Sequence, residues 1–374
     1  RVTAQTVLSP EPLPAFPRST VDGYALKAAD TFGASDSLPI YLEVTGEAPM
    51  GAAPAFALHK RQAALVYTGG MLPEGADAVV MVEQTQTSRP GELEVLRAVA
   101  PAENVLLAGE DAQVGAVVIL GGTRLRPPEI GGLMALGLTR VRVTRPPRVG
   151  ILSSGDEVIS PQETPRPGQV RDVNSYTLAA LVQQTGGAPV RYGILPDRAE
   201  DLQQALERAL AECDLVVLTA GSSASARDLT AAAIQNAGHP GVLVHGVNVR
   251  PGKPTILAVC DGKPVIGLPG NPVSALVIAG LFVRPAIERL SGESPVRPRS
   301  QVAAHLTLNL ASQAGREDWV PVRLSSTPDG CLAEPIFYKS NLIFSLVQAD
   351  GLVCIPSAAT GLAAGDEVSV VILS

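Results

Sequence analysis

Residues 197–218 read DRAEDLQQALERALAECDLVVL, and this stretch predicts a helix followed by a buried strand. Leucine and alanine recur at i, i+3, i+4, i+7 and i+8 from Leu202 to Leu210, which is the spacing of one apolar helix face. Asp197 and Glu200 have the D-x-x-E spacing of a capping box at the helix start. The unbroken apolar run at residues 215–218 is typical of a strand covered on both faces, as in a parallel sheet.

The same alternation of strand and helix precedes this stretch. Arg148–Leu152 predicts a short buried strand, and Val190–Leu195 predicts a second one. Between them, Ser175–Gln184 predicts a helix that ends at Gly186-Gly187. Strands that alternate with helices form a parallel sheet with helices on both faces. We therefore predict a doubly wound α/β domain over residues 145–293, with ligands at the carboxyl ends of its strands.

The flanks of this domain have a different pattern. Residues 21–111 predict a mostly β module, from the alternating segments Tyr41–Thr45, Ala63–Tyr67 and Ala78–Val82. Residues 1–20 and 112–144 are expected to form a small α/β linker domain with a strand at Val117–Leu120 and a helix from Pro127. Residues 294–374 predict a C-terminal β-barrel or sandwich, from the strand-like segments Gln301–Leu310, Trp319–Leu324, Gly351–Ile355 and Glu367–Leu373.

Length and composition exclude several classes of protein. A chain of 374 residues is expected to hold two or three domains, and 46% hydrophobic against 17% charged residues indicates a globular chain. The net charge of −7 argues against nucleic acid or an anionic membrane as the main partner. The longest apolar run, Ala275–Val283, is far shorter than the roughly 20 residues of a membrane-spanning helix. The start at Arg1 suggests that natural N-terminal residues are missing and shows no signal peptide.

Cysteine and histidine provide no recognisable site. The four cysteines are widely separated without a CxxC pair, which favours reduced thiols in a cytoplasmic protein over disulfides or a zinc site. The four histidines show no metal-ligand spacing, and we assign them no catalytic role. These residues are Cys213, Cys260, Cys331, Cys354, His59, His239, His245 and His305.

Two rigid loops flank one predicted short hydrophobic strand. The first is Arg250-Pro251-Gly252-Lys253-Pro254, and the second begins at Pro269-Gly270-Asn271-Pro272. Proline fixes the backbone, and glycine lets it approach a ligand closely, so the pair predicts the mouth of a pocket. Arg250 and Lys253 favour a polyanion as the ligand. The alternative is a pair of tight turns with solvated cations.

Further polar motifs follow the predicted strands. The small-residue loop Gly221-Ser222-Ser223 leads to a helix predicted at Leu229–Ala237, and such a helix start can bind an anion. Alternatively, Ser225 or Asp228 is simply the N-cap of that helix. Ser153–Glu157 predicts a divalent-cation site through Asp156 and Glu157, or else a solvated turn, while Asp172 and Asn174 fit helix N-caps. Asp22 and the loop after Thr68 are each typical of turns.

Taken together, the motifs resemble those of the molybdopterin molybdenumtransferase family, which includes bacterial MoeA and the E domain of gephyrin. The resemblance extends over nearly the whole chain in order. It implies a MoaB/MogA-like parallel-sheet domain, the β module, the linker domain and a C-terminal β-barrel. The motifs are S-x-x-D-G-Y-A at Ser19–Ala25, T-G-x-x-L-P-x-G-A-D-A-V-V at Thr68–Val80, Gly109-Glu110-Asp111, S-G-D-E at Ser154–Glu157, RPGKP at Arg250–Pro254 and LPGNPVSA at Leu268–Ala275.

The resemblance also implies an activity. Members of this family take adenylylated molybdopterin and molybdate, release AMP in the presence of Mg²⁺, and act as homodimers whose sites combine two subunits. The implied catalytic residues are Asp22, Thr68, Asp111, Glu157, Asp197 and Asp228, with Asp22, Glu157 and Asp228 as metal ligands. The implied substrate-binding residues are Ser154, Gly155, Gly221, Ser222, Ser223, Arg250, Lys253, Pro269, Gly270 and Pro272.

The chain departs from the family pattern at three places, which indicates a divergent branch. Residues 220–228 carry Ala and Ser where the family has Gly, and Gly246 replaces a common Lys. The opening motif reads FPRSTVDGYA in place of FDNSAMDGYA. Two alternatives to the transferase therefore remain: a non-catalytic protein that binds or delivers the molybdopterin cofactor, and a scaffold protein like gephyrin.

Overall fold

The computed structural model describes residues 1–220, 224–296, 298–328, 330–337 and 339–373. The chain divides into two compact units, each of which is described by itself. Unit 1 comprises residues 1–4, 122–124 and 143–374, and unit 2 comprises residues 5–121 and 125–142.

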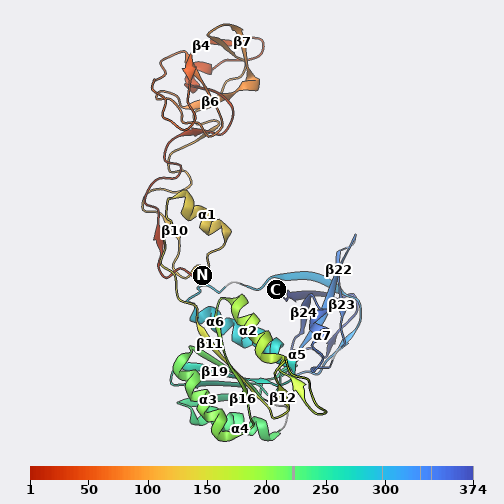
Figure 1. The fold of residues 1–374 in the computed structure, drawn as a ribbon. Coiled ribbons are helices and arrows are strands. Elements are labelled where there is room, and N and C mark those ends of the chain that lie inside the picture. The colour runs from red at the N-terminus through yellow and green to blue at the C-terminus, as the bar shows by residue number, and fades with distance from the viewer. Residues whose placement is uncertain (221–223, 297, 329, 338, 374) are drawn as a thin grey trace. The chain divides into compact units, whose positions relative to one another are not determined.

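The predicted doubly wound domain is present in unit 1 (Figure 1). Its six-stranded sheet has the order β14-β11-β15-β19-β18-β16, in which β14, β11, β15 and β19 are parallel and β18 and β16 extend one edge in antiparallel pairing. The strands are β11 (Arg148–Ser154), β14 (Ala188–Leu195), β15 (Leu215–Ala220), β16 (Pro240–His245), β18 (Ile256–Cys260) and β19 (Lys263–Pro269). The two rigid loops therefore flank a two-stranded hairpin, β18 and β19, and not the single strand that was predicted.

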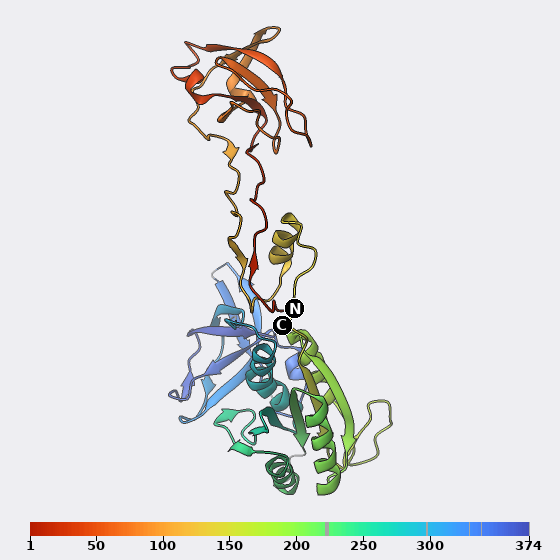
Figure 2. The same cartoon turned by 90° about the vertical axis from the view of Figure 1, so that its left-hand side faces the viewer.

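Helices cover both faces of this sheet, as Figure 2 shows from a second side. Leu178 and Val182 of α2 pack with α5, η3 and α6 on one face, while Leu206 of α3 and Ile234 of α4 pack on the other. The bounds are α2 (Asn174–Thr185), α3 (Ala199–Glu212), α4 (Ala224–Asn236), α5 (Pro272–Ile278), the π-helical turn η3 (Ala279–Val283) and α6 (Arg284–Leu290). The short strands β12 (Val158–Ile159) and β13 (Val170–Arg171) pair beside the sheet.

The predicted capping box of α3 is wrong. The N-cap is Arg198, and no side chain caps the helix. The Arg198 N–H donates to the Pro196 carbonyl at 2.7 Å, which forms a tight turn and leaves Asp197 outside the helix. The Asp197 N–H instead donates to the Asp156 carboxylate at 3.1 Å.

The start of α4 was also predicted too late. The helix begins at Ala224, not at Leu229, because alanine at 224 and 226 favours helix. Asp228 therefore lies inside the helix, so neither it nor Ser225 is the N-cap. At the start of α2, the N-cap is Val173, so neither Asp172 nor Asn174 is the predicted N-cap. The Asp172 carboxylate nevertheless accepts a hydrogen bond from the Ser175 N–H at 3.0 Å.

The C-terminal part of unit 1 is a closed barrel. Strands β22, β23, β20, β26 and β24 pair in that order, and β24 pairs back with β22. The strands are β20 (Gln301–Leu306), β22 (Glu317–Thr327), β23 (Gly330–Pro335), β24 (Gly351–Ile355) and β26 (Glu367–Ile372), with β21 (Leu310–Ala311), β25 (Gly361–Leu362) and helix α7 (Phe344–Val347) beside them. Strand β17 (Val249–Arg250) leaves the α/β domain and pairs with β22 of the barrel.

Unit 2 contains the predicted β module. Its six-stranded sheet has the order β6-β3-β5-β4-β8-β7 around a core that includes Leu26, Leu42 and Leu93. The strands are β3 (Gly23–Leu26), β4 (Ile40–Glu47), β5 (Gln62–Val66), β6 (Ala78–Met81), β7 (Thr85–Arg89) and β8 (Glu92–Val95). The rest of the unit comprises β1 (Val7–Leu8), β2 (Arg18–Ser19), β9 (Val105–Leu106), β10 (Val117–Ile119), the 3₁₀ turns η1 (Ala28–Thr31) and η2 (Val82–Gln84), and α1 (Pro127–Ala135).

Two predictions of the sequence concern disulfides and membrane-spanning helices. All four cysteines are free thiols, and Cys213 and Cys260 are buried. Within the described part of the chain, no helix has the length and apolar character needed to cross a membrane.

Candidate functional site

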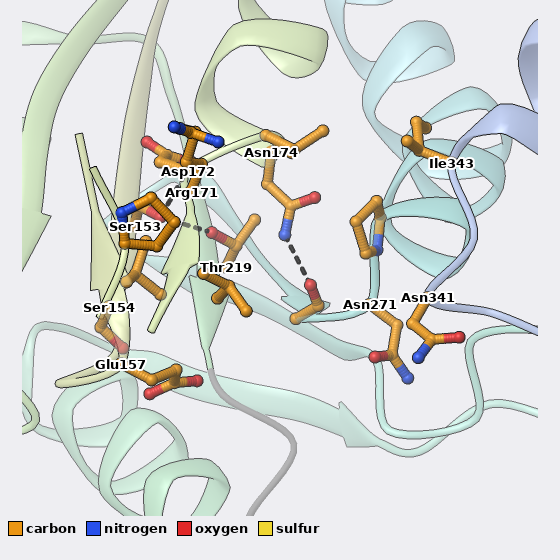
Figure 3. A pocket seen from close by; sticks show the side chains of 16 residues that line it. Ser153, Ser154, Glu157, Arg171, Asp172, Asn174, Thr219, Asn271, Asn341 and Ile343 are labelled. Atoms are coloured by element: carbon orange, nitrogen blue, oxygen red, sulfur yellow. Dashed lines mark hydrogen bonds between the residues drawn. The ribbon is translucent and has the colours of Figure 1, made fainter. Parts of the chain in front are cut away.

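The carboxyl ends of three neighbouring parallel strands line a pocket of about 530 Å³. Ser153 and Ser154 end β11, Thr219 lies near the end of β15, and Gly270 follows β19. Doubly wound domains bind ligands at this edge of the sheet. We call it the strand-end pocket; its polar side chains are Ser153, Ser154, Glu157, Arg171, Asp172, Asn174, Thr219, Asn271 and Asn341 (Figure 3).

A buried hydrogen-bond network holds one side of the strand-end pocket. The Thr219 hydroxyl lies 3.3 Å from the Ser153 hydroxyl, which in turn donates to Asp172 at 3.4 Å. The same carboxylate accepts from the backbone N–H and the hydroxyl of Ser175. This network joins β11, β15 and the start of α2, so the pocket wall is fixed before a ligand binds.

Asn174 lies in this pocket with half of its amide unpaired. Its Nδ2 donates to the carbonyl of Gly270 at 2.7 Å, and Figure 3 shows the amide pointing down from α2 between Thr219 and Asn271. The residue is 8% exposed, and its Oδ1 has no hydrogen-bond partner among the described residues. A buried unpaired acceptor costs about 1–3 kcal/mol, which a donor on a ligand would recover.

A glycine turn positions Glu157 at the pocket wall. Gly155 has a φ of +149°, and a Cβ built there would lie 2.9 Å from Oε2 of Glu157 and 2.8 Å from Val158. Only glycine therefore lets the Glu157 carboxylate fold back over this turn. Glu157 lines the pocket and is exposed, so its oxygens can accept hydrogen bonds or hold a cation.

Asp197 lies beside the same turn. Because its N–H donates to the Asp156 carboxylate, the ends of β14 and β11 are joined at this point. Its own carboxylate is half-buried and has no hydrogen-bond partner in the part of unit 1 that the structure describes. The Asp197 carboxylate therefore does not form the capping box that was the alternative to a functional role for this residue.

A second pocket, of about 740 Å³, lies between the α/β domain and the barrel of unit 1. The two rigid loops line it together, which confirms that they form one pocket mouth. Among its described lining residues, Arg250, Lys253 and Lys339 supply three cations against one carboxylate, Asp318. We call it the cationic pocket; its lining also includes Pro269, Asn271, Ser274, Asn309, Trp319 and Ser340.

Gly252 is required by packing at the base of the cationic pocket. It has a φ of +125°, and a Cβ there would lie 2.2 Å from Cγ1 of Ile278 in helix α5. The glycine therefore lets the loop lie against a helix of the protein itself, whereas the sequence suggested close approach to a ligand.

The barrel holds Arg250 through Asp318. Val249 and Arg250 pair with Glu317 and Asp318 of β22, and Arg250 Nη1 lies 3.4 Å from Oδ2 of Asp318. The Asp318 side chain is 5% exposed and also accepts from Nε of Arg316 at 2.8 Å. Since the Arg250 side chain is 63% exposed, most of its donors remain available to an anion.

In unit 2, the structure brings Asp22 and Thr68 together. One carboxylate oxygen of Asp22 accepts from the Thr68 N–H at 2.8 Å and from its hydroxyl at 2.9 Å. These two hydrogen bonds hold the pKa of Asp22 below its ordinary value, and the backbone hydrogen bond has the larger effect. Asp22 is therefore an exposed anion whose second oxygen can accept from a substrate or ligate a cation.

Asp111 lies elsewhere in unit 2. Its N–H donates to the Leu13 carbonyl at 2.9 Å, and it lines the groove between β10 and α1. Among the described residues, no hydrogen bond joins Asp111 to Asp22 or to Thr68.

The remaining predicted site residues are dispersed. Asp228 is exposed on α4, and Gly221, Ser222 and Ser223 lie outside the described residues. Ser154, Gly270 and Pro272 line the strand-end pocket, while Lys253 and Pro269 line the cationic pocket. Within the described residues, no group of three His, Cys, Asp or Glu side chains has the arrangement of a metal site.

Sequence reasoning missed several pocket residues. Thr219 and Ser153 lie near the carboxyl ends of buried strands, so this position was a usable signal. Asn174 was explained as a helix cap, and its contact with Gly270, 96 positions away, has no local signature. Lys339, Ser340 and Asn341 were not selected because they lie in a loop of the barrel.

Comparisons with known proteins cover the whole chain. Three family models match: "MoeA N-terminal region (domain I and II)" at residues 1–137, "Probable molybdopterin binding domain" at 150–289 and "MoeA C-terminal region (domain IV)" at 303–373. A putative molybdopterin biosynthesis protein of Methanocaldococcus jannaschii is 36% identical over 100% of this chain and 89% of its own length.

Two further relatives agree with these matches. A molybdopterin molybdenumtransferase of Nostoc is 33% identical over 99% of this chain and 86% of its own length. The crystal structure of a molybdopterin biosynthesis MoeA protein from Pyrococcus horikoshii aligns with a TM-score of 0.85 at 33% identity, covering 100% of this chain and 91% of that one.

Proposed function

We propose that this chain, which belongs to the MoeA family, is a molybdopterin molybdenumtransferase of molybdenum cofactor synthesis. It takes adenylylated molybdopterin and molybdate, places molybdenum on the dithiolene sulfurs of the pterin and releases AMP. Because the sulfur ligands come from the substrate, the protein needs anion donors and carboxylates and no cysteine cluster.

One observation carries this proposal: the strand-end pocket and the cationic pocket adjoin at Asn271, which lines both. The strand-end pocket presents neutral hydrogen-bonding groups, the carboxylates Glu157 and Asp172, and one described cation, Arg171. The cationic pocket presents Arg250 and Lys253. This pair of pockets suits a substrate that carries an uncharged polar ring next to phosphate or oxyanion groups.

We assign the binding of anions to Arg250 and Lys253, with the Ser274 hydroxyl as a further donor. Arg250 offers planar paired donors and Lys253 a point charge, which together stabilise charge on a phosphate or on molybdate. Gly221, Ser222 and Ser223, which precede α4 in the sequence, are proposed as additional anion donors on the family motif alone.

We further propose that the protein acts as a homodimer in the cytoplasm. The family motifs assign catalytic roles to residues of both units: Asp22, Thr68 and Asp111 in unit 2, and Glu157, Asp197 and Asp228 in unit 1. A site built from unit 1 of one copy and unit 2 of a second copy would bring these groups together.

Mg²⁺ is the proposed metal. Magnesium sites usually combine one or two carboxylates with substrate phosphates, so the lack of a three-residue cluster among the described residues is compatible with it. Asp22, Glu157 and Asp228 are each exposed carboxylates and would hold the ion together with the phosphates. When bound, the ion would offset the negative charge of the phosphate that leaves with AMP.

The test is release of AMP from adenylylated molybdopterin by the purified protein, with and without molybdate and Mg²⁺. We expect Arg250→Ala to reduce release at least tenfold, whereas Arg323→Ala, which removes an exposed arginine of β22 outside both pockets, should have no effect. Tight binding of the adenylylated substrate without AMP release would instead identify a non-catalytic binding or delivery protein.

A further inference from the structure

The geometry points to Asn174 as a specificity-determining residue: its Oδ1 accepts a hydrogen bond from the exocyclic amino group of the pterin ring in the strand-end pocket. This inference rests on the proposed function and goes beyond it, because it says which part of the substrate enters which pocket. The pterin ring lies in the strand-end pocket, and the phosphate lies beyond Asn271 in the cationic pocket.

The contact of Asn174 with Gly270 settles which amide atom is available. A backbone carbonyl only accepts hydrogen bonds, so the atom 2.7 Å from the Gly270 oxygen is the amide nitrogen. The oxygen is left without a partner among the described residues, in a side chain that is 8% exposed. The pocket therefore offers a fixed, recessed acceptor (Figure 3).

A recessed acceptor selects a particular kind of group. Phosphates and ionised carboxylates carry acceptors only, so they would be repelled by Oδ1 of Asn174 and by the nearby Glu157 and Asp172 carboxylates. A pterin carries an amino group that projects from its ring and donates hydrogen bonds. Of the groups on the pterin, this amino group both projects from the ring towards a recessed oxygen and donates to it.

The charge distribution of the two pockets supports the same orientation. Among the described residues that line the strand-end pocket, Arg171 is the only cation, and its Nε donates to the Glu163 carbonyl at 3.2 Å. The cationic pocket carries three cations among its described lining residues, and one carboxylate, Asp318, which pairs with Arg250 and Arg316. Phosphate groups in the strand-end pocket would lie against its carboxylates, and a neutral pterin in the cationic pocket would lie among cations.

The experiment compares two probes on the full chain by calorimetric titration: pterin, and pteridin-4-one, which has hydrogen in place of the amino group. We expect the wild-type protein to prefer pterin by at least about tenfold, the usual effect of one buried hydrogen bond. In Asn174→Ala this preference should fall to nearly one, whereas Asn236→Ala, an exposed asparagine at the end of α4, should retain it. The preference is a ratio within one variant, so a general loosening of the pocket does not imitate the effect.

The outcomes separate this inference from the proposed function. If the wild type binds both probes equally, or if Asn174→Ala keeps the preference, the role of Asn174 is refuted while AMP release can still support the transferase. The wild-type comparison holds even if Asn174→Ala does not fold. If the wild type binds neither probe and releases no AMP, the proposed function fails, and the inference fails with it.

Discussion

Replacement of Gly252 by alanine should disturb the cationic pocket through a buried clash. The new Cβ would lie 2.2 Å from Cγ1 and 2.4 Å from Cδ1 of Ile278, a fully buried side chain of the α/β core. Carbon atoms prefer separations of about 3.5–4.0 Å. Overpacking of this kind costs about 1–3 kcal/mol. The φ of +125° adds backbone strain of about 1–2 kcal/mol for a residue with a Cβ.

Gly262→Ala is the matched control. Gly262 joins β18 to β19, has a φ of +82°, and nothing lies within 4 Å of a Cβ built there. Only the strain of about 1–2 kcal/mol should remain. The clash alone should therefore make Gly252→Ala melt about 2–12 °C below Gly262→Ala, at about 2–4 °C per kcal/mol.

Trp319 provides the assay for this comparison. It is the single tryptophan of the chain and lines the cationic pocket, so its fluorescence reports the melting of unit 1. Equal melting temperatures for the two variants would refute the claim that Gly252 is needed because its loop presses on Ile278. The same variants can be titrated with tungstate, a tetrahedral oxyanion that stands in for molybdate. Tungstate should bind more weakly to Gly252→Ala only, because only that substitution displaces the Arg250 loop.

Three further predictions concern charged groups. Asp318→Asn should weaken tungstate binding to the cationic pocket about tenfold in equilibrium dialysis, since Arg250 loses the anion that orients it; unchanged binding would contradict this positioning role. Thr68→Val removes the hydroxyl donor but keeps the backbone N–H, so the pKa of Asp22 should rise only part of the way to 3.8 in an NMR titration. The stability that ionised Asp22 contributes is present above its ordinary pKa, and it is lost as the pH falls through the lowered pKa of the folded state. Glu293→Gln should reduce the unfolding free energy by about 1–3 kcal/mol, because Arg124 donates to that buried carboxylate at 3.0 and 2.8 Å; an unchanged urea midpoint would count against it.

Local pattern predicted much of the fold. The helix face from Leu202 to Leu210 and the run Leu215–Leu218 were both found where periodicity placed them, in α3 and β15. Residues 351–355 form β24 with the predicted bounds. Periodicity succeeds in these segments because burial of one face depends on the residues within a few turns or pleats.

The errors occurred where a distant contact competes with a local preference. Asp197 has the spacing of a capping residue, but it lies one position before the N-cap, and its N–H donates to the Asp156 carboxylate. Asn174 likewise fits a helix cap and instead donates to Gly270. In both cases a local side-chain preference of about 1 kcal/mol is overridden by a contact that the sequence does not display.

The sequence by itself determined the family, the doubly wound domain and the two rigid loops, because motif order and apolar spacing are carried by neighbouring residues. Only the tertiary structure decided that these loops meet the barrel in one cationic pocket, and that Asp318 orients an arginine 68 positions away. It also decided which side chain in the strand-end pocket has an oxygen without a hydrogen-bond partner among the described residues. Such contacts arise when strand pairing brings the ends of β11, β15 and β19 together, and pairing over long separations leaves no periodic trace in the chain.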